Sequence, residues 1–106
     1  MNLPLSEYLD FARQTAFEAG RLTLGYFQAG VQADFKADDT PVTVADRRAE
    51  EHIRRAIEAR YPDHRIMGEE FGAGGGGGDA PCWYIDPIDG TKSFIRGVPL
   101  YGVLLG

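Results

Sequence analysis

Residues 82–94, which read Cys-Trp-Tyr-Ile-Asp-Pro-Ile-Asp-Gly-Thr-Lys-Ser-Phe, constrain the fold more than any other stretch of this chain. The first four residues are apolar or aromatic and predict a buried strand. Asp86 and Asp89 follow three residues apart, and Gly90 can take the positive φ of a tight turn. A strand that ends in two acids beside a helix start can hold a divalent cation and a phosphate together. A turn in which Asp and Gly supply only turn chemistry is the alternative.

Three better-known motifs do not match the sequence. An EF-hand loop counted from Asp86 would need a Glu where Gly97 stands. The glycine run over residues 74–78 leads into Asp79, not into the Lys-Ser/Thr of a Walker A loop. Aspartyl-phosphate phosphatases have their nucleophile two residues before the second Asp, and that position is Pro87. Metal-activated water is therefore favoured over a covalent aspartyl route.

Length, charge and cysteine content limit the class of protein. The 106 residues suffice for one small domain, and a hydrophobic content of 43% is typical of a globular protein. The net charge of −5 argues against a nucleic-acid partner and suits a carboxylate-rich metal site. Cys82, as a single cysteine, favours a reducing cytoplasm and is interpreted as a core residue. We see no secretory signal and no membrane span, so we expect a cytoplasmic protein without membrane contact.

Two stretches have the periodicity of helices. The first covers residues 6–27, and its aromatic side chains are expected in the core. Its predicted apolar stripe consists of Leu5, Tyr8, Leu9, Ala12, Ala16 and Ala19. The second begins with the capping box formed by Thr43 and Asp46 and ends before Pro62. Its predicted apolar face consists of Ala45, Ala49, Ile53, Ala56, Ile57 and Tyr61.

The other face of the second helix is predicted to be solvated. Glu50 with Arg54, and Glu51 with Arg55, have the spacing of surface ion pairs. His52 has no second metal-ligand candidate one turn away, so it is interpreted as structural or solvent-facing.

Short strands are predicted at residues 31–36, 65–67 and 100–105, and residues 72–78 are predicted to form a flexible loop. The strand at 65–67 leads into Gly68-Glu69-Glu70, so it too ends in acid. Two neighbouring strands that end in carboxylates can converge on one cation. An apolar strand directly before the last residue is unusual for a complete domain, which predicts a truncated one.

Three motifs in this order resemble the inositol monophosphatase family of Mg²⁺-dependent, lithium-sensitive phosphatases. They are Pro-Val-Thr-Val-Ala-Asp at residues 41–46, Gly-Glu-Glu at 68–70 and Asp-Pro-Ile-Asp-Gly-Thr at 86–91. The resemblance runs over nearly all of the chain. Residues 91–102 are most similar to the histidinol-phosphatase branch, which removes phosphate from histidinol phosphate in histidine biosynthesis.

The resemblance implies an α/β (α+β) fold, the layered αβαβα sandwich, of which residues 1–106 would be a single N-terminal, metal-binding domain with two helices packed on part of a sheet. It implies two or three Mg²⁺ ions. Glu69, Asp86 and the Ile88 carbonyl would bind one ion, and Asp86 and Asp89 would bind a second. The expected partner is a small phosphate monoester, and a homodimer is possible because family members often dimerise.

The resemblance also implies catalytic residues. Asp46 and Thr91, with Glu69, would position and activate the attacking water. The backbone N–H groups of Gly90 and Thr91 would hold the phosphate, and Lys36 matches a family lysine near the site. The capping and catalytic roles of Asp46 can coexist if its two carboxylate oxygens divide them.

The function expected from the resemblance is hydrolysis of histidinol phosphate. Inositol monophosphate or another sugar phosphate is the alternative substrate. A different hypothesis is that the chain is a catalytically incomplete fragment, since family members are more than twice as long and their C-terminal half supplies a further metal-binding Asp.

Overall fold

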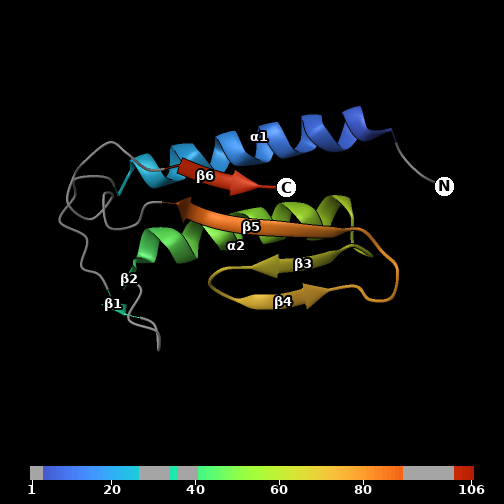
Figure 1. Cartoon of the computed structure of the whole chain (residues 1–106). Helices are drawn as coiled ribbons and strands as arrows, with labels where there is room; N and C mark the ends of the chain where they lie inside the picture. The colour runs from blue at the N-terminus through green and yellow to red at the C-terminus, as the bar shows by residue number, and fades with distance from the viewer. Residues whose placement is uncertain (1–3, 27–33, 36–40, 90–101) are drawn as a thin grey trace.

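In the described part of the chain, two helices pack on one face of a four-stranded sheet (Figure 1). The computed structural model describes residues 4–26, 34–35, 41–89 and 102–106. The elements are α1 (Leu5–Leu24), β1 (Asp34–Phe35), β2 (Pro41–Val42), α2 (Val44–Arg60), β3 (Arg65–Gly68), β4 (Gly72–Gly75), β5 (Cys82–Asp89) and β6 (Gly102–Leu105). This arrangement confirms the predicted α/β class and the expectation of two helices on part of a sheet.

Helix α1 confirms the predicted first helix, and Tyr8, Ala12 and Ala19 of its predicted stripe contact the core, but other members of the stripe are exposed. The buried residues are Thr15, Ala19 and Thr23, which are four residues apart and so share one face. Leu5 is 83% exposed and Phe17 is 61% exposed, so their expected burial was wrong, as it was for Leu9. Hydrophobicity misled here because a threonine can be buried when its hydroxyl is bonded, as Thr23 is to the Gly20 carbonyl at 2.7 Å.

Helix α2 runs antiparallel to α1 behind the sheet and begins with the predicted capping box (Figure 1). The Thr43 backbone N–H donates to Asp46 Oδ2 at 2.8 Å, and the Asp46 N–H donates to Thr43 Oγ1 at 3.3 Å. The predicted apolar face is buried, except that Ala56 is half-buried. The predicted structural interpretation of His52 is confirmed, since its Nε2 lies 3.0 Å from Glu18 Oε1 on α1.

Glu18 receives a second bond that strengthens this link between the helices. The Gln14 amide donates to its other carboxylate oxygen at 3.0 Å. Hydrogen bonds with the side chains of Gln14 and His52 hold the pKa of the Glu18 carboxyl below its usual value. Neither helix in the described residues is both long and apolar enough to cross a bilayer.

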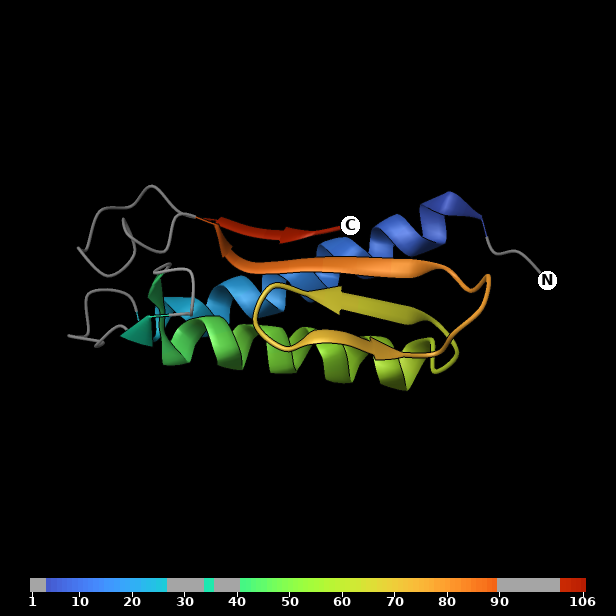
Figure 2. The same ribbon diagram turned by 60° about the horizontal axis from the view of Figure 1, so that its bottom comes forward.

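The sheet has the strand order β4-β3-β5-β6, in which β3 and β5 are parallel and the other pairs antiparallel. Alternate residues of β3 and β5 face the helices, so Ile66, Trp83 and Ile85 are buried. Met67 and Tyr84 are paired on the opposite face, where both are exposed. Figure 2 shows that both helices lie on the same side of the sheet.

Strand β4 corrects the prediction that residues 72–78 form a flexible loop. Residues 72–75 pair antiparallel with β3 over its full length. The loop was predicted because glycines have no side chains. Strand pairing uses backbone N–H and C=O groups, so it does not require side chains. At Gly75, φ is +78°, and an added Cβ would overlap the His64 carbonyl oxygen, so the glycine permits a close backbone approach.

Strand β5 is longer than predicted, because the expected turn from Asp86 onward is strand as far as Asp89. Its register with β6 shifts between Asp86 and Asp89, where the buried Pro87 lies. A proline lacks the N–H that a regular ladder needs and is tolerated at such an irregularity. Strands β1 and β6 lie within the predicted strands 31–36 and 100–105.

Five rings, two of them from α1, meet where the helices cover the sheet. They belong to Tyr8, Phe11, Tyr61, His64 and Trp83. The Trp83 indole N–H donates to His64 Nδ1 at 3.0 Å, so the buried indole has its polar partner. Cys82, the residue before Trp83, is a half-buried free thiol and is not among the core residues, so its interpretation as a core residue was wrong.

We expect Ile53→Ala to lower the free energy of unfolding by about 2–5 kcal/mol, because the side chain is fully buried between α2 and the sheet. Urea denaturation followed by circular dichroism measures the change. Leu24→Ala is the control, since Leu24 is 62% exposed, and it should cost no more than about 0.5 kcal/mol. Equal losses in the two variants would contradict this packing.

Candidate metal centre

Glu69 and Asp86 are brought together by the parallel pairing of β3 with β5. The register places Gly68 opposite Ile85, and the Glu69 N–H donates to the Ile85 carbonyl at 2.9 Å. Each acid therefore follows one member of the same strand pair, at the edge where the carboxyl ends of parallel strands meet. The predicted neighbourhood of two acid-ending strands is confirmed, while metal binding by these residues stays a prediction.

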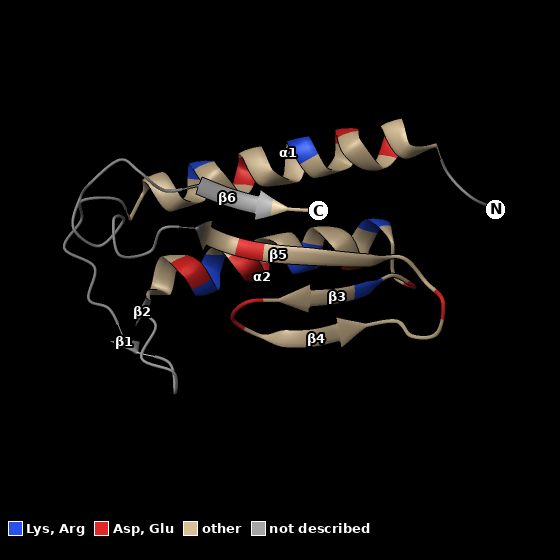
Figure 3. Ribbon diagram, viewed as in Figure 1, with Lys and Arg blue, Asp and Glu red and all other residues tan. Residues whose placement is uncertain are grey.

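Asp46 lies in the first turn of α2, which begins at the same end of the molecule as the carboxyl ends of β3 and β5 in both views (Figures 1 and 2). The side chain is buried, and Oδ2 accepts bonds from the Thr43 N–H at 2.8 Å and the Thr43 hydroxyl at 2.6 Å. Figure 3 shows acidic segments of α2, β5 and the β3–β4 turn toward this end. Acidic residues of three elements thus lie toward one end of the sheet, with the basic Arg47 and Arg48 directly after Asp46 in α2.

Several predicted site residues lie outside the described residues. They are Lys36, Gly90 and Thr91, together with the side chain of Asp89, whose backbone ends β5. Ile88 is buried in β5. Its side chain has no oxygen, so only its backbone carbonyl could bind a cation. The described structure thus brings together Glu69, Asp86 and the start of α2.

The donor set fits Mg²⁺ in its chemistry. Mg²⁺ prefers oxygen ligands and usually takes one or two carboxylates, with water and substrate phosphate completing its shell. Glu69 is exposed and Asp86 half-buried, and both are carboxylates. Within the described residues no group of three or more His, Cys, Asp or Glu side chains could hold a metal ion. The further predicted acidic ligand, Asp89, has its side chain outside the described residues.

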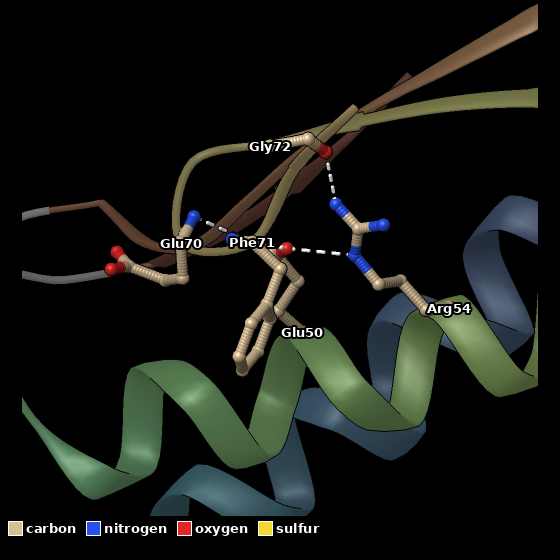
Figure 4. A network of polar contacts seen from close by, with 5 residues as sticks. All are labelled: Glu50, Arg54, Glu70, Phe71 and Gly72. Atoms are coloured by element: carbon tan, nitrogen blue, oxygen red, sulfur yellow. Dashed lines mark hydrogen bonds and ion pairs between the residues drawn. The ribbon is translucent and has the colours of Figure 1, made fainter. Parts of the chain in front are cut away.

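Glu50 and Arg54 correct the prediction of a solvated surface pair (Figure 4). The Glu50 side chain is fully buried and that of Arg54 is 14% exposed. Glu50 Oε1 accepts the Glu70 N–H at 2.8 Å, and Oε2 accepts the Phe71 N–H at 2.9 Å and Arg54 Nε at 2.8 Å. Arg54 also donates to the Gly72 carbonyl. The pair therefore binds the turn after β3, whereas Glu51 and Arg55 form the exposed pair that was predicted.

Sequence spacing contains a signal for this burial. Glu50 precedes Ile53 by three residues and Ile57 by seven, so all three lie on one face of α2. Gly68 is the second sign, because an added Cβ there would overlap the Glu50 carboxylate. A glycine before an acidic pair thus marks a close approach as well as a turn.

Comparisons with known proteins identify relatives over almost the whole chain. The model of the inositol monophosphatase family matches residues 4–106. A histidinol-phosphatase of Chlorobaculum parvum is 54% identical over 98 residues, which are 92% of this chain and 38% of that protein. A fructose-1,6-bisphosphatase/inositol-1-monophosphatase of Aquifex aeolicus is 36% identical over 96% of this chain and 39% of its own length.

A solved structure of similar fold is the IMPase of Thermotoga maritima. It superimposes with a TM-score of 0.82 at 32% identity, covering 93% of this chain and 38% of that one. The chain thus spans less than two fifths of the length of this structure, as it does of the two curated relatives.

We expect Gly68→Ala to destabilise the chain by about 1–3 kcal/mol, because the new methyl group would displace the buried Glu50 carboxylate. Urea denaturation measures the loss. Gly77→Ala is the matched control, since an added Cβ there meets nothing within 4 Å. If both variants were equally stable, the close approach of Glu50 to β3 would be wrong.

Proposed function

This chain belongs to the inositol monophosphatase family, and on that premise we propose that it carries the metal site of a Mg²⁺-dependent phosphomonoesterase. The proposed reaction is hydrolysis of histidinol phosphate to histidinol and phosphate, a step of histidine biosynthesis. The 54% identity to a histidinol-phosphatase, against 36% to a fructose-1,6-bisphosphatase/inositol-1-monophosphatase, supports this substrate.

The observation that carries the metal chemistry is the β3–β5 register. Because Gly68 pairs with Ile85, the next residue of each strand is an acid, and the two carboxylates start from adjacent backbone positions. Mg²⁺ is commonly bound by one or two carboxylates together with water and substrate phosphate. Two carboxylates that start from adjacent backbone positions support Glu69 and Asp86 as ligands of one ion.

The remaining proposed ligands follow along β5. The Ile88 carbonyl would complete the first site, and Asp89 would share a second ion with Asp86. When bound, Mg²⁺ would lower the pKa of a coordinated water and stabilise charge on the leaving ester oxygen.

The chain's own groups would orient the reactants. Asp46, fixed in the first turn of α2 by its bonds to Thr43, would with Thr91 position and activate the attacking water. Glu69 would serve catalysis through the same ion that it binds. The N–H groups of Gly90 and Thr91 would bind phosphate, and Lys36 would add positive charge beside it.

The alternative substrate is inositol monophosphate or another sugar phosphate. The Aquifex aeolicus relative supports this alternative, because it is named both a fructose-1,6-bisphosphatase and an inositol-1-monophosphatase. The metal site would be the same, so only the substrate test separates the two.

The test of the proposal is phosphate release from histidinol phosphate and from inositol 1-phosphate, each with Mg²⁺ and with EDTA. We expect Mg²⁺-dependent release from histidinol phosphate at least about tenfold faster, a discrimination of about 1.4 kcal/mol. Faster release from inositol 1-phosphate would favour the alternative. Absence of release from both would contradict phosphatase activity of this chain and agree with an incomplete fragment.

We expect Asp89→Asn to reduce Mg²⁺-dependent phosphate release by more than about 100-fold, beyond the loss usual for an outer-shell partner. The substitution removes the charge that would face the second ion while it keeps the volume of the side chain. A colorimetric phosphate assay measures the loss, and thermal unfolding should show a nearly unchanged midpoint.

Asp79→Asn is the matched control for this experiment. It makes the same chemical change at an exposed residue between β4 and β5, so activity should match that of the unmodified chain. Near-normal release by Asp89→Asn would contradict the two-ion assignment.

A further inference from the structure

We infer that Glu50 is a positioning residue for Glu69: its buried carboxylate, braced by Arg54, holds the turn after β3 and thereby sets the direction of the Glu69 side chain. The inference rests on the proposed role of Glu69 as a metal ligand. It assigns a task to a pair of residues that sequence spacing alone presents as a surface ion pair.

The backbone of Glu69 is held on both sides. The peptide before it is fixed by β5, since the Glu69 N–H donates to the Ile85 carbonyl at 2.9 Å. The peptide after it is fixed by α2, since the Glu70 N–H donates to Glu50 Oε1 at 2.8 Å. Peptide groups are planar, so fixing two successive planes determines φ and ψ of the residue between them. Glu50 therefore restrains the backbone of Glu69 from the side opposite to β5 along the chain.

The same carboxylate continues along the turn. Oε2 accepts the Phe71 N–H at 2.9 Å, and Arg54 reaches past Glu50 to the Gly72 carbonyl (Figure 4). Consecutive backbone groups from Glu70 to Gly72 are thus bonded to two side chains of α2. The turn is bonded to α2, and the first turn of α2 carries Asp46. The same helix therefore positions both Glu69 and Asp46.

The burial of the pair distinguishes it from an ordinary helix ion pair. Glu51 and Arg55, one residue further on, are 3.8 Å apart, and the Arg55 side chain is 80% exposed. The Glu50 side chain is fully buried, the Arg54 side chain is 14% exposed, and Arg54 Nε lies 2.8 Å from Glu50 Oε2. A buried ion pair is often no more stabilising than apolar residues of the same volume, because both charges lose their hydration. Its directional bonds to the turn therefore account for the pair better than stability does.

Metal sites depend on such support. A ligand must be held within about 0.5 Å of its productive position, which requires a surrounding shell that fixes it. Loss of an outer-shell hydrogen-bond partner typically weakens metal affinity by about 10–100-fold. The charge of Glu50 makes its bonds to the backbone N–H groups stronger than neutral ones.

The first experiment measures Mn²⁺ binding to the chain by electron paramagnetic resonance of the free ion. Glu50→Gln keeps the side-chain volume but replaces one acceptor oxygen by a donor and leaves Arg54 without its counter-charge. We expect Mn²⁺ affinity to fall by about 10-fold or more. Glu51→Gln, the same change in the exposed pair, should alter affinity by less than about twofold.

Arg54→Lys is the second variant, in case Glu50→Gln does not fold. Lysine keeps the charge but lacks the fork that reaches Glu50 and the Gly72 carbonyl together. We expect a fall in Mn²⁺ affinity of about three- to tenfold. Arg55→Lys is its matched control and should leave affinity unchanged.

The second readout needs no metal. Amide hydrogen exchange at Glu70 and Phe71 should be faster by about 10-fold in Glu50→Gln than in Glu51→Gln, because the acceptor of both amides is altered. A residue that served stability alone would lower the unfolding midpoint and leave the Mn²⁺ affinity of the folded protein unchanged. Equal Mn²⁺ affinity in folded Glu50→Gln and Glu51→Gln would overturn the inference.

Glu69→Gln separates failure of this inference from failure of the proposed function. If Glu69→Gln weakens Mn²⁺ binding and Glu50→Gln does not, the positioning role alone is wrong. If Glu69→Gln leaves Mn²⁺ affinity unchanged, the ligand assignment is wrong, and the positioning role is overturned with it.

Discussion

The parallel pairing of β3 with β5 is the interaction on which the rest of the described structure depends. It places the chain directly after β3 beside Asp86 and fixes the Glu69 amide to the Ile85 carbonyl. Parallel strands require the chain to return to its starting end between them. Here the return is made by β4 at the edge of the sheet, and the glycine run allows its backbone to pass close to His64. Strand β4, whose residues have almost no side chains, thus makes the parallel pairing of β3 with β5 possible.

Helix α2 joins the core to the candidate metal centre. Its apolar residues, Ile53 and Ile57 among them, are buried against the sheet. Glu50 and Asp46 are also buried, about one and two turns before Ile53. The packing of Ile53 and Ile57 against the sheet therefore determines where Asp46 and Glu50 lie. Asp46 completes the cap at the start of α2, and Glu50 bonds to the turn after β3. Two acids of one helix thus stabilise two different segments near the candidate metal centre.

The sequence predicted those features that depend on nearby residues. The capping box at Thr43, the apolar face of α2 and the acidic ends of two strands follow from spacings within one element. Three motifs in order were enough to indicate the family, which the match over residues 4–106 confirms. The roles of Lys36, Gly90 and Thr91 stay predictions, since these residues lie outside the described part of the chain.

Tertiary structure decided what depends on residues far apart in the sequence. The spacing of Glu50 and Arg54 is the same as that of Glu51 and Arg55, yet only the first pair is buried, because β3 and its turn cover that side of α2. Residues 72–75 form a strand because their backbone pairs with the edge of β3. Leu5, the first residue of α1, stays exposed, whereas Tyr8, Ala12 and Ala19 of the same predicted stripe contact the core. Local sequence determines the periodicity, caps and chemistry of each element. Which face is buried, and which charge is brought to a backbone amide, is determined only when the elements pack.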